Sequence, residues 1–452
     1  MRFSTNGIRE IVGDRLTPAS AVAVAGAIAG VAPRTGPVAL GRDGRTSSRA
    51  LSDLVGATLA LAGHDVVDLG LLPTPAIQYN VPRVPAAFGV AITASHNPPE
   101  YNGMKCLDLR GRSIAPTTER AIEAAVAASS SCAVPFDRVG ELRTDPPGAA
   151  RYLEGILGQV DRERVRARKF TVVLDCGNGA SAVTSPELLR RLGCRVITLN
   201  GHVDGRFPGR TSEPNERTLK ELIRAVPAFD ADLGIAHDGD GDRTLFVDGH
   251  GRFVPGDKSL ALLSREAARA GGSRAVVTPV STSQVVEDVV QPFGARVVYT
   301  PVGSPKLTKE MERVDAVIGG EENGGVVFPR FQLARDGAMT AAALLDLLAR
   351  SDRPFDALLD ELPPYTLVKE RVSCPPERAL PVVTAVAEGF AEGAHRVVTL
   401  DGFKIFLDGG WMLLRPSGTE PIVRIFAETR DPESARRMAD AAVARVREML
   451  GN

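Results

Sequence analysis

A serine in a short polar turn is the first residue of this chain whose type and setting could do chemistry. Ser95 lies in Thr93-Ala-Ser-His-Asn-Pro98, after the apolar run 87–92, and Lys105 follows ten residues later. An apolar run that ends before two prolines predicts a strand and then a turn, where α/β proteins carry reactive groups. Ser95 could be a nucleophile or a phosphate carrier. It could equally belong to an ordinary Ser-Asx turn, and this segment alone does not choose.

Three aspartates at alternate positions form the second candidate site. Asp238, Asp240 and Asp242 are separated by single glycines and follow a short apolar run. Glycines permit the tight turn that would aim three carboxylates at one point, and Mg²⁺ prefers a few carboxylates plus a phosphate oxygen. An EF-hand is excluded, because its glycine position holds Arg243 and its glutamate position holds Gly249. A solvated acidic turn is the remaining alternative, and the spacing favours a divalent cation.

Two glycine-containing loops could bind the rest of a substrate. In the loop Gly319-Gly-Glu-Glu-Asn-Gly-Gly325, Glu321 and Asn323 offer acceptors and donors to sugar hydroxyls. A glycine-rich turn with solvated charges would have the same sequence pattern. The second loop holds two guanidinium groups, two hydroxyls and an exposed backbone N–H, which together predict a cradle for a dianion. Its members are Arg415, Ser417, Gly418, Thr419 and Arg424.

Smaller signals accompany these loops. Arg9 follows a glycine turn near the start of the chain. The segment 41–48, Gly-Arg-Asp-Gly-Arg-Thr-Ser-Ser, could bind an anion at a helix N-terminus or be a capped turn with structural ion pairs. His96, beside Ser95, could move a proton or brace the turn.

Short apolar runs alternate with helix-period segments through most of the chain, which predicts βαβ units on parallel or mixed sheets. The expected helices include 46–63, 116–129, 217–225, 257–271, 282–291 and 336–351. Strands are expected at 37–41, 65–69, 87–93, 170–174, 194–199, 232–236, 274–279, 295–299 and 314–318. The pattern restarts near 169 and near 274, so we expect three successive α/β domains.

The last ~90 residues have a different organisation. Strands at 365–372, 396–400, 403–407, 410–414 and 422–427 accompany helices at 376–391 and 431–449, which predicts a separate α+β domain after the linker prolines 363–364. The predicted domains are 1–146, with the serine loop; 147–249, with the aspartates; 250–362, with the Glu321 loop; and 363–452, with the arginine loop.

Composition excludes several classes of protein. The net charge is −1, with 54 Lys and Arg against 55 Asp and Glu, whereas a nucleic-acid or membrane-surface protein would need a basic excess. The 5 cysteines show no CxxC pair and match neither a disulfide framework nor a zinc site. No signal-peptide pattern or run of ~20 apolar residues occurs. We therefore expect a cytoplasmic protein with a small-molecule substrate, no nucleic-acid partner and no membrane partner.

Taken together and in this order, the motifs closely resemble the α-D-phosphohexomutase family, which includes phosphoglucomutase, phosphomannomutase and phosphoglucosamine mutase. Further matching segments are Asp175-Cys-Gly-Asn-Gly179, Pro208-Gly-Arg210 and Thr300-Pro-Val-Gly303, and the resemblance runs from Phe3 to about Phe426. It implies four domains around a central cleft, each contributing one loop.

The resemblance also implies a role for each candidate residue. Ser95 would be the phosphoserine and a metal ligand, and Asp238, Asp240 and Asp242 would hold Mg²⁺ beside it. Arg9, Lys105 and Arg243 would neutralise charge, and His96 would assist proton transfer. Glu321 and Asn323 would bind the sugar. The arginine loop (Arg415, Ser417, Gly418, Thr419, Arg424) would bind the phosphate that does not react.

The implied reaction interconverts hexose or hexosamine 6-phosphate and 1-phosphate through a hexose bisphosphate intermediate, which also serves as activator. Asn323 and the opening Thr5-Asn-Gly-Ile-Arg9 resemble archaeal-type members and favour glucosamine phosphate, with a phosphomannomutase/phosphoglucomutase of broad specificity as the alternative. A sugar-phosphate phosphatase and a non-catalytic binding protein are the alternatives of another class. Gly325 stands where some members have histidine and Pro301 where many have lysine, so the general acid/base and one phosphate contact stay open. Homo-oligomer formation is a separate open question.

Overall fold

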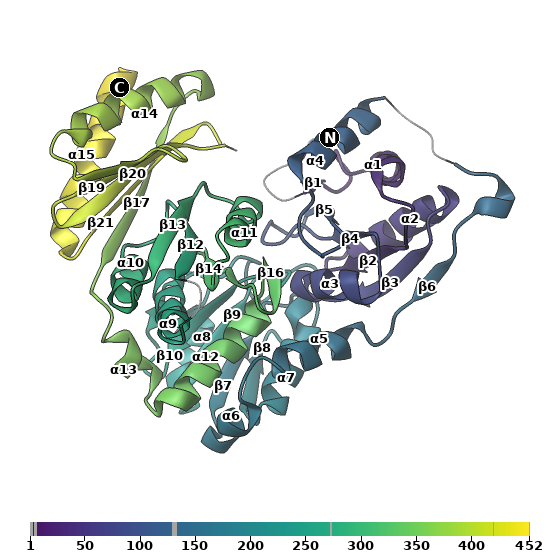
Figure 1. The fold of residues 1–452 in the computed structure, drawn as a ribbon, viewed down its shortest axis with the longest axis horizontal. Helices are drawn as coiled ribbons and strands as arrows, with labels where there is room; N and C mark the ends of the chain where they lie inside the picture. Colours follow the sequence, from purple (N-terminus) through teal and green to yellow (C-terminus); the bar gives the residue numbers. More distant parts are fainter. Residues whose placement is uncertain (1–2, 4–6, 129–132, 272–273, 419, 452) are drawn as a thin grey trace. The chain divides into compact units, whose positions relative to one another are not determined.

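The computed structural model describes residue 3 and residues 7–128, 133–271, 274–418 and 420–451 (Figure 1). The chain divides into two compact units. The first unit comprises Met1–Ser259 and Asn323–Asp356, and the second comprises Leu260–Glu322 and Ala357–Asn452.

A six-stranded mixed sheet opens the first unit. Its order is β1 (Ile8–Ile11), β5 (Tyr101–Leu107), β4 (Phe88–Ile92), β2 (Val38–Arg42), β3 (Val66–Leu71) and β6 (Leu142–Thr144). Strands β4, β2, β3 and β6 run parallel, while β5 and β1 are antiparallel additions at one edge. The parallel strands therefore end together, and their carboxyl ends carry the loops that follow residues 42 and 92.

Helices cover both faces of this sheet. On one face α1 (Pro18–Val31), α2 (Ser48–Leu61) and α4 (Pro116–Ala127) share a core with alternate strand residues such as Val38 and Leu40. On the other, Ile77 of α3 (Thr74–Asn80) packs against Gly41, where any Cβ would clash with it. A capping box between Thr17 and Ser20 starts α1, whose alanine- and valine-rich sequence has almost no amphipathic period.

The second sheet of the first unit positions the aspartates. Its order is β11 (Phe253–Val254), β10 (Thr244–Asp248), β9 (Leu233–His237), β7 (Thr171–Asp175) and β8 (Arg195–Leu199). Strands β8, β7 and β9 are parallel and β10 turns back against β9. The first unit also contains the helices α5 (Gly148–Leu157), α6 (Arg162–Arg168), α7 (Ser185–Arg191), α8 (Lys220–Ala228) and α12 (Gly337–Ser351). Its strands β15 (Val326–Phe328) and β16 (Gln332–Arg335) pair antiparallel with each other.

In the second unit, β12 (Ala275–Pro279) pairs in parallel with β13 (Arg296–Thr300) and with β14 (Ile318–Gly320). The helices α10 (Val285–Val290) and α11 (Ser304–Arg313) connect them, and α9 (Gly256–Arg269) and α13 (Phe355–Leu359) lie near the chain's crossings between units. The C-terminal part is an antiparallel sheet, β17 (Thr366–Ser373), β21 (Ile422–Thr429), β20 (Gly410–Pro416), β19 (Phe403–Leu407) and β18 (Arg396–Val398). Its helices α14 (Pro376–Ala391) and α15 (Pro432–Leu450) share one core with the sheet (Figure 1).

A buried lysine joins these two parts of the second unit. Lys404 is 0% exposed, and its Nζ donates to the carbonyl oxygen of Thr282 at 2.7 Å. The Nζ lies 3.8 Å from the centroid of the Trp411 ring and 4.6 Å from that of Tyr299. Aromatic faces and a carbonyl thus replace the water that this ammonium loses on burial.

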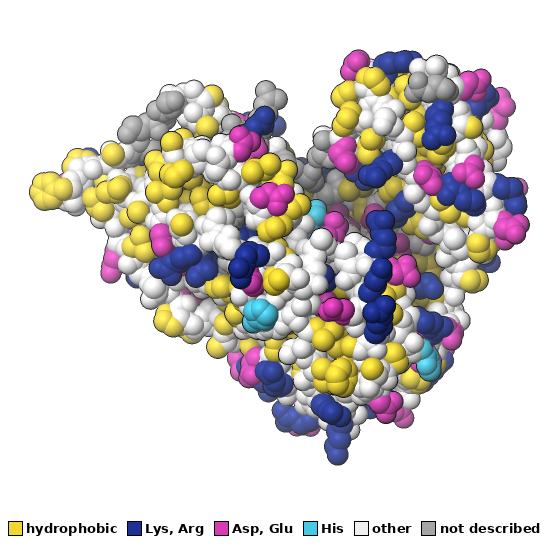
Figure 2. Space-filling model, turned by 180° about the vertical axis from the view of Figure 1, so that it is seen from behind, with side chains coloured by type: hydrophobic (Ala, Val, Ile, Leu, Met, Phe, Trp, Pro, Cys, Tyr) yellow, Lys and Arg dark blue, Asp and Glu magenta, His cyan; other side chains and the backbone are white. Residues whose placement is uncertain are grey.

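The α/β class and the α+β character of the C-terminal part are confirmed by the structure. The predicted strand 314–318 was wrong in place, because α11 continues to Arg313 and β14 begins only at Ile318. Within the described residues, no helix is both long and apolar enough to cross a membrane. On the face shown in Figure 2, basic and acidic side chains are interspersed.

Candidate active site

Ser95 lies in a strained turn directly beyond β4. Its φ is 51°, in the left-handed region, and its backbone N–H donates to Thr93 Oγ1 at 2.9 Å. A non-glycine residue in this region costs about 1–2 kcal/mol, so the surrounding contacts must hold it there. The serine is 1% exposed, which gives its hydroxyl a fixed place.

Arg45 supplies most of those contacts. Its guanidinium donates to the carbonyl oxygens of Ser95 and Asn97 at 2.8 and 2.6 Å, and to those of Pro98 and Tyr101 at 2.6 and 2.8 Å. Asp43 pairs with Arg45 at 3.2 Å and both are buried. Segment 41–48 therefore holds the serine loop through Arg45 and contains the Asp43–Arg45 ion pair, whereas Ser47, at the N-cap of α2, makes no side-chain capping hydrogen bond.

The aspartate loop reaches this serine from the other sheet. Asp238, Asp240 and Asp242 connect β9 to β10, and each offers an oxygen within 4.8 Å of the others. Gly241, at φ 74°, makes the turn between them. Ser95 Oγ donates to Asp238 Oδ2 at 3.2 Å. The structure thus brings together the two strongest motifs of the sequence, which are 143 residues apart.

The three carboxylates fit a divalent cation. They are 0–1% exposed, and burial followed by the charges of Asp240 and Asp242 raises the pKa of Asp238 well above its ordinary value. Asp240 Oδ1 and Asp242 Oδ1 are buried and have no hydrogen-bond partner in the described part of the chain. Buried acceptors without donors are costly, and a hard cation such as Mg²⁺ would satisfy them.

Four cationic side chains belong to the same region. Arg243 Nε lies 3.8 Å from Asp242 Oδ1, and Arg335 pairs with Asp242 Oδ2. Burial alone would raise the pKa of Asp242, but Arg335 and Arg243 hold it below its ordinary value. Burial lowers the pKa of Lys105 to about 8, against the opposing charges of Asp242 and Asp240. Arg9 donates to Asn97 Oδ1 at 3.1 Å, and burial lowers its pKa as well.

His96 is neutral in this setting. Burial, followed by the charges of Arg243 and Arg9, lowers its pKa to about 2. Its Nδ1 lies 3.5 Å from Ser95 Oγ and 3.1 Å from Arg243 Nη2. Because a guanidinium can only donate, Nδ1 is the acceptor and the ring proton belongs on Nε2.

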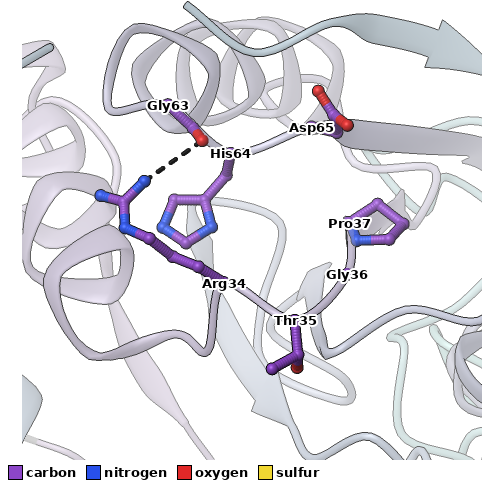
Figure 3. A pocket seen from close by; sticks show the side chains of 7 residues that line it. All are labelled: Arg34, Thr35, Gly36, Pro37, Gly63, His64 and Asp65. Atoms are coloured by element: carbon purple, nitrogen blue, oxygen red, sulfur yellow. Dashed lines mark hydrogen bonds between the residues drawn. The ribbon is translucent and has the colours of Figure 1, made fainter. Parts of the chain in front are cut away.

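Pockets lined by described residues of the first unit include the following two. One, of about 440 Å³, is lined by His96 and the 206–215 segment, including Glu213, which accepts from Arg243 Nη1 at 3.0 Å. The other is lined by Arg34–Pro37 and Gly63–Asp65 (Figure 3). It lies where β2 and β3 begin, whereas Ser95 follows the carboxyl end of the parallel strand β4. There Arg34 donates to the carbonyl oxygen of Gly63, which closes the α2–β3 turn.

The predicted sugar-binding residues fall on either side of the division between units. Glu321, in the second unit, follows β14 and is 3% exposed. Its neighbour Glu322 accepts from Ser281 Oγ at 3.0 Å and lies 3.7 Å from Lys369 Nζ. Asn323, in the first unit, accepts from the Gly325 backbone N–H at 3.1 Å.

The arginine loop joins two paired strands of the second unit. Arg415 on β20 and Arg424 on β21 are direct cross-strand partners. Asp401 lies 3.0 Å from Arg415, Glu420 pairs with Arg424, and Ser417 Oγ accepts from the Glu420 backbone N–H at 3.3 Å. Gly418 is exposed, and Thr419 lies outside the described residues. Like charges placed opposite one another are unfavourable, so the pair suits an anion.

Comparison with known proteins identifies the family of this chain. The four phosphoglucomutase/phosphomannomutase domain models, α/β/α domains I, II and III and the C-terminal domain, match residues 1–132, 150–251, 255–365 and 370–445. The chain belongs to the phosphoglucomutase/phosphomannomutase family. As a member of this α-D-phosphohexomutase family, it is an enzyme of the mutase type.

Individual members of the family align over almost the whole chain. A phosphoglucomutase/phosphomannomutase of Thermococcus kodakarensis is 40% identical over 99% of both chains. A protein of Methanopyrus kandleri, named probable phosphoglucosamine mutase, is 42% identical over 98% of this chain and 97% of its own. A crystal structure of a phosphoglucomutase/phosphomannomutase family protein from Burkholderia thailandensis superposes with a TM-score of 0.87 at 28% identity, covering 99% of this chain and 98% of that one.

Sequence reasoning missed four side chains that hold the site. Arg45 clamps the serine loop, Thr74 donates to Asp240, Glu213 pairs with Arg243, and Arg335 pairs with Asp242. Thr74 and Arg335 lie 166 and 93 residues from their aspartates, and no local spacing connects them. Of these four side chains, only Arg45 lies in a segment that the sequence analysis singled out, 41–48. That segment did not reveal that Arg45 holds the serine loop.

Proposed function

We propose that this phosphohexomutase interconverts glucosamine 6-phosphate and glucosamine 1-phosphate through a phosphoserine at Ser95. One observation carries the proposal: Ser95 Oγ lies 3.2 Å from Asp238 Oδ2, in a triad where two buried carboxylate oxygens have no hydrogen-bond partner in the described chain. Mg²⁺ held by Asp238, Asp240, Asp242 and the phosphoserine would supply charge neutralisation for the transferred phosphoryl group.

The reaction needs two balanced half-reactions. In the first, the P–O bond to Ser95 Oγ breaks, a P–O bond to the free sugar hydroxyl forms, and the hydroxyl proton leaves to a base. That proton passes to Ser95 Oγ and the hexose bisphosphate reorients. The P–O bond to its other sugar oxygen then breaks, a P–O bond to Ser95 Oγ forms, and the serine proton passes through the base to that sugar oxygen. Lys105, Arg9 and Arg243 offset charge on the phosphoryl oxygens. His96, whose Nδ1 lies 3.5 Å from Ser95 Oγ, is our candidate for proton transfer, a role that requires the bound substrate to release Nδ1 from Arg243 and to raise the low pKa of the ring.

The remaining side chains would hold the sugar. Glu321 and Asn323 would bind its hydroxyls, and Arg415, Ser417, Gly418, Thr419 and Arg424 would bind the phosphate that does not react. We place the domain boundaries at 146/147, 249/250 and 362/363, so that each domain supplies one loop. Asn323 and the relative from Methanopyrus kandleri support glucosamine, whereas the Thermococcus kodakarensis relative supports glucose and mannose.

A substrate panel tests this proposal. The purified chain, with Mg²⁺ and a trace of hexose 1,6-bisphosphate, is given glucosamine, glucose and mannose phosphates, and kcat/KM is compared. We expect the highest value with glucosamine phosphate and a phosphorylated peptide that contains Ser95. Ser95→Ala should abolish turnover, while Ser351→Ala on α12 should not. Release of free phosphate without isomerisation would indicate a phosphatase, and full turnover of Ser95→Ala would overturn the proposal.

A further inference from the structure

The six oxygens of the aspartate triad are not equivalent. Asp238 accepts hydrogen bonds at both oxygens, from Ser95 Oγ at 3.2 Å and from the Arg243 backbone N–H at 3.1 Å. Asp240 and Asp242 each have one engaged oxygen, Oδ2, and one oxygen, Oδ1, that has no hydrogen-bond partner among the residues the structure describes. Asp240 and Asp242 therefore each present a single available oxygen, and Asp238 Oδ2 becomes available when Ser95 is phosphorylated and has no hydroxyl proton to donate.

The two engaged oxygens are held by side chains from outside the aspartate loop. Thr74 Oγ1, at the start of α3, donates to Asp240 Oδ2 at 2.7 Å, and the Thr74 backbone N–H donates to the Asp240 carbonyl oxygen at 2.9 Å. Arg335, at the end of β16, pairs with Asp242 Oδ2. Thr74 is 0% exposed and Arg335 is 7% exposed, so water does not compete freely for these contacts.

A glycine gives Arg335 its path to the triad. A Cβ added at Gly325 would overlap Arg335 Cδ, so any side chain there would displace the arginine. The backbone beyond Arg335 is also fixed, since the N–H groups of Asp336 and Gly337 donate to the carbonyl oxygens of Val326 and Gly241 at 3.0 and 3.1 Å. The start of α12 is thereby joined to the aspartate loop itself.

We propose that Arg335 and Thr74 select the metal by restricting Asp242 and Asp240 to one ligating oxygen each. This proposal rests on the magnesium-dependent function proposed above. Mg²⁺ takes six oxygens at 2.0–2.1 Å, whereas Ca²⁺ takes six to eight at 2.3–2.6 Å and often binds both oxygens of a carboxylate. Carboxylates with one oxygen already engaged suit the smaller ion. Arg335 and Thr74 act through the aspartates, so they are positioning residues.

The affinity ratio of the two ions separates this effect from simple charge. Arg335 repels Mg²⁺ and Ca²⁺ alike, because both carry two charges, so removing the guanidinium strengthens the binding of both. Only a change in available ligand oxygens alters the ratio of their dissociation constants. Calorimetric titration of the intact protein with Mg²⁺ alone and with Ca²⁺ alone measures that ratio without turnover.

Arg335→Met should shift the ratio of the two dissociation constants in favour of Ca²⁺ by about tenfold, the scale on which outer partners of metal ligands change metal affinity. Thr74→Val should shift it in the same direction. Arg335→Lys keeps the charge but loses the planar fork, and Gly325→Ala displaces the arginine, so both should give smaller shifts. Arg330→Met is the matched control, since Arg330 is exposed on the turn before β16.

Ratios within twofold of the parent protein for both Arg335→Met and Thr74→Val would overturn the inference while leaving the mutase proposal intact. If Arg335→Met does not fold, the ratios of Arg335→Lys and Gly325→Ala decide in the same way. Absence of any divalent-cation binding by the parent protein would instead overturn the proposed magnesium site, and this inference with it.

Discussion

The serine–aspartate region and the arginine loop are both proposed to meet phosphate, yet they are built in opposite ways. In the first, the three aspartates are 0–1% exposed, and their partners include Thr74 of α3 and Ser95 of the loop after β4. In the second, the side chains of Arg415 and Arg424 are 15% and 36% exposed and pair with carboxylates of their own C-terminal sheet or its loops. Among the described residues, the serine–aspartate region leaves two buried carboxylate oxygens without a hydrogen-bond donor. The arginine loop holds its guanidinium groups in ion pairs that an incoming anion can replace.

This difference follows from the task proposed for each region. Bond making and breaking requires groups held in fixed positions in a water-excluded setting, where charges act strongly. Binding a phosphate that does not react requires only charge and donors, and the same loop must accept either end of a reorienting sugar. Partly exposed arginines can adjust, so the contrast should appear as effects on kcat in one region and on KM in the other.

The largest effect is expected at the triad. Asp240→Asn removes a charge from the proposed metal site, and loss of several kcal/mol of transition-state stabilisation should lower kcat about 10²–10³-fold. Metal affinity measured by calorimetry should fall in parallel. Asp230→Asn is the control, because Asp230 is exposed and its positive φ suits asparagine. A kcat equal to that of the parent protein would remove the basis of the comparison.

The arginine loop should respond in KM. Arg415→Met removes charged hydrogen bonds worth about 1.5–3 kcal/mol, so KM for the sugar phosphate should rise roughly 10- to 100-fold with a smaller change in kcat. Arg424→Met should have a weaker effect, because Arg424 is more exposed. Arg437→Met, at an exposed site on α15, should leave both constants unchanged. A fall in kcat alone would contradict a binding role.

Lys105 makes the serine–aspartate region sensitive to alkaline pH. With a pKa of about 8, the Lys105 side chain is mostly the neutral amine at pH 9, so kcat should fall about tenfold between pH 7 and pH 9. Lys105→Arg keeps its charge and should flatten this part of the pH profile. An unchanged profile in that variant would show that Lys105 does not set the alkaline limb.

Lys105 should affect folding stability in the opposite direction. Between about pH 8 and 10.5 the unfolded chain binds the Lys105 proton more tightly than the folded chain does. Its contribution to the free energy of unfolding therefore increases with pH over this window, while activity decreases. Denaturant titrations of the parent and of Lys105→Met across the window measure this contribution as a difference in slope.

The smallest effect is expected at Glu213, which joins the buried region to solvent. Its side chain is 50% exposed, and ion pairs of that kind contribute about 0.2–1 kcal/mol, so Glu213→Gln should lower kcat by at most about fivefold. Glu216→Gln, three residues later and exposed, is the control. A loss as large as that of Asp240→Asn would show that Arg243 depends on Glu213 for its position.

Local sequence predicts many of the strands, turns and helices of this protein. The strand before Ser95, the glycines between the aspartates and the C-terminal strand and helix segments each report on residues close in the chain, where period and turn chemistry act. Helix α1 was missed because its alanine-rich sequence has almost no amphipathic period. Strand β1 was missed because it forms through an antiparallel partner 90 or more residues away, Ile8 opposite Met104.

By itself the sequence determined the reactive residue types, their turns and the family resemblance that the comparisons confirmed. Only the tertiary structure decided which atoms meet: Ser95 with Asp238, Thr74 with Asp240, and Arg335 with Asp242. The physical reason is that motif spacing is set by local backbone geometry, whereas the state of each carboxylate oxygen depends on donors carried in by distant strands and helices. Those donors, together with burial, determine which carboxylate oxygens of the triad would face the proposed cation.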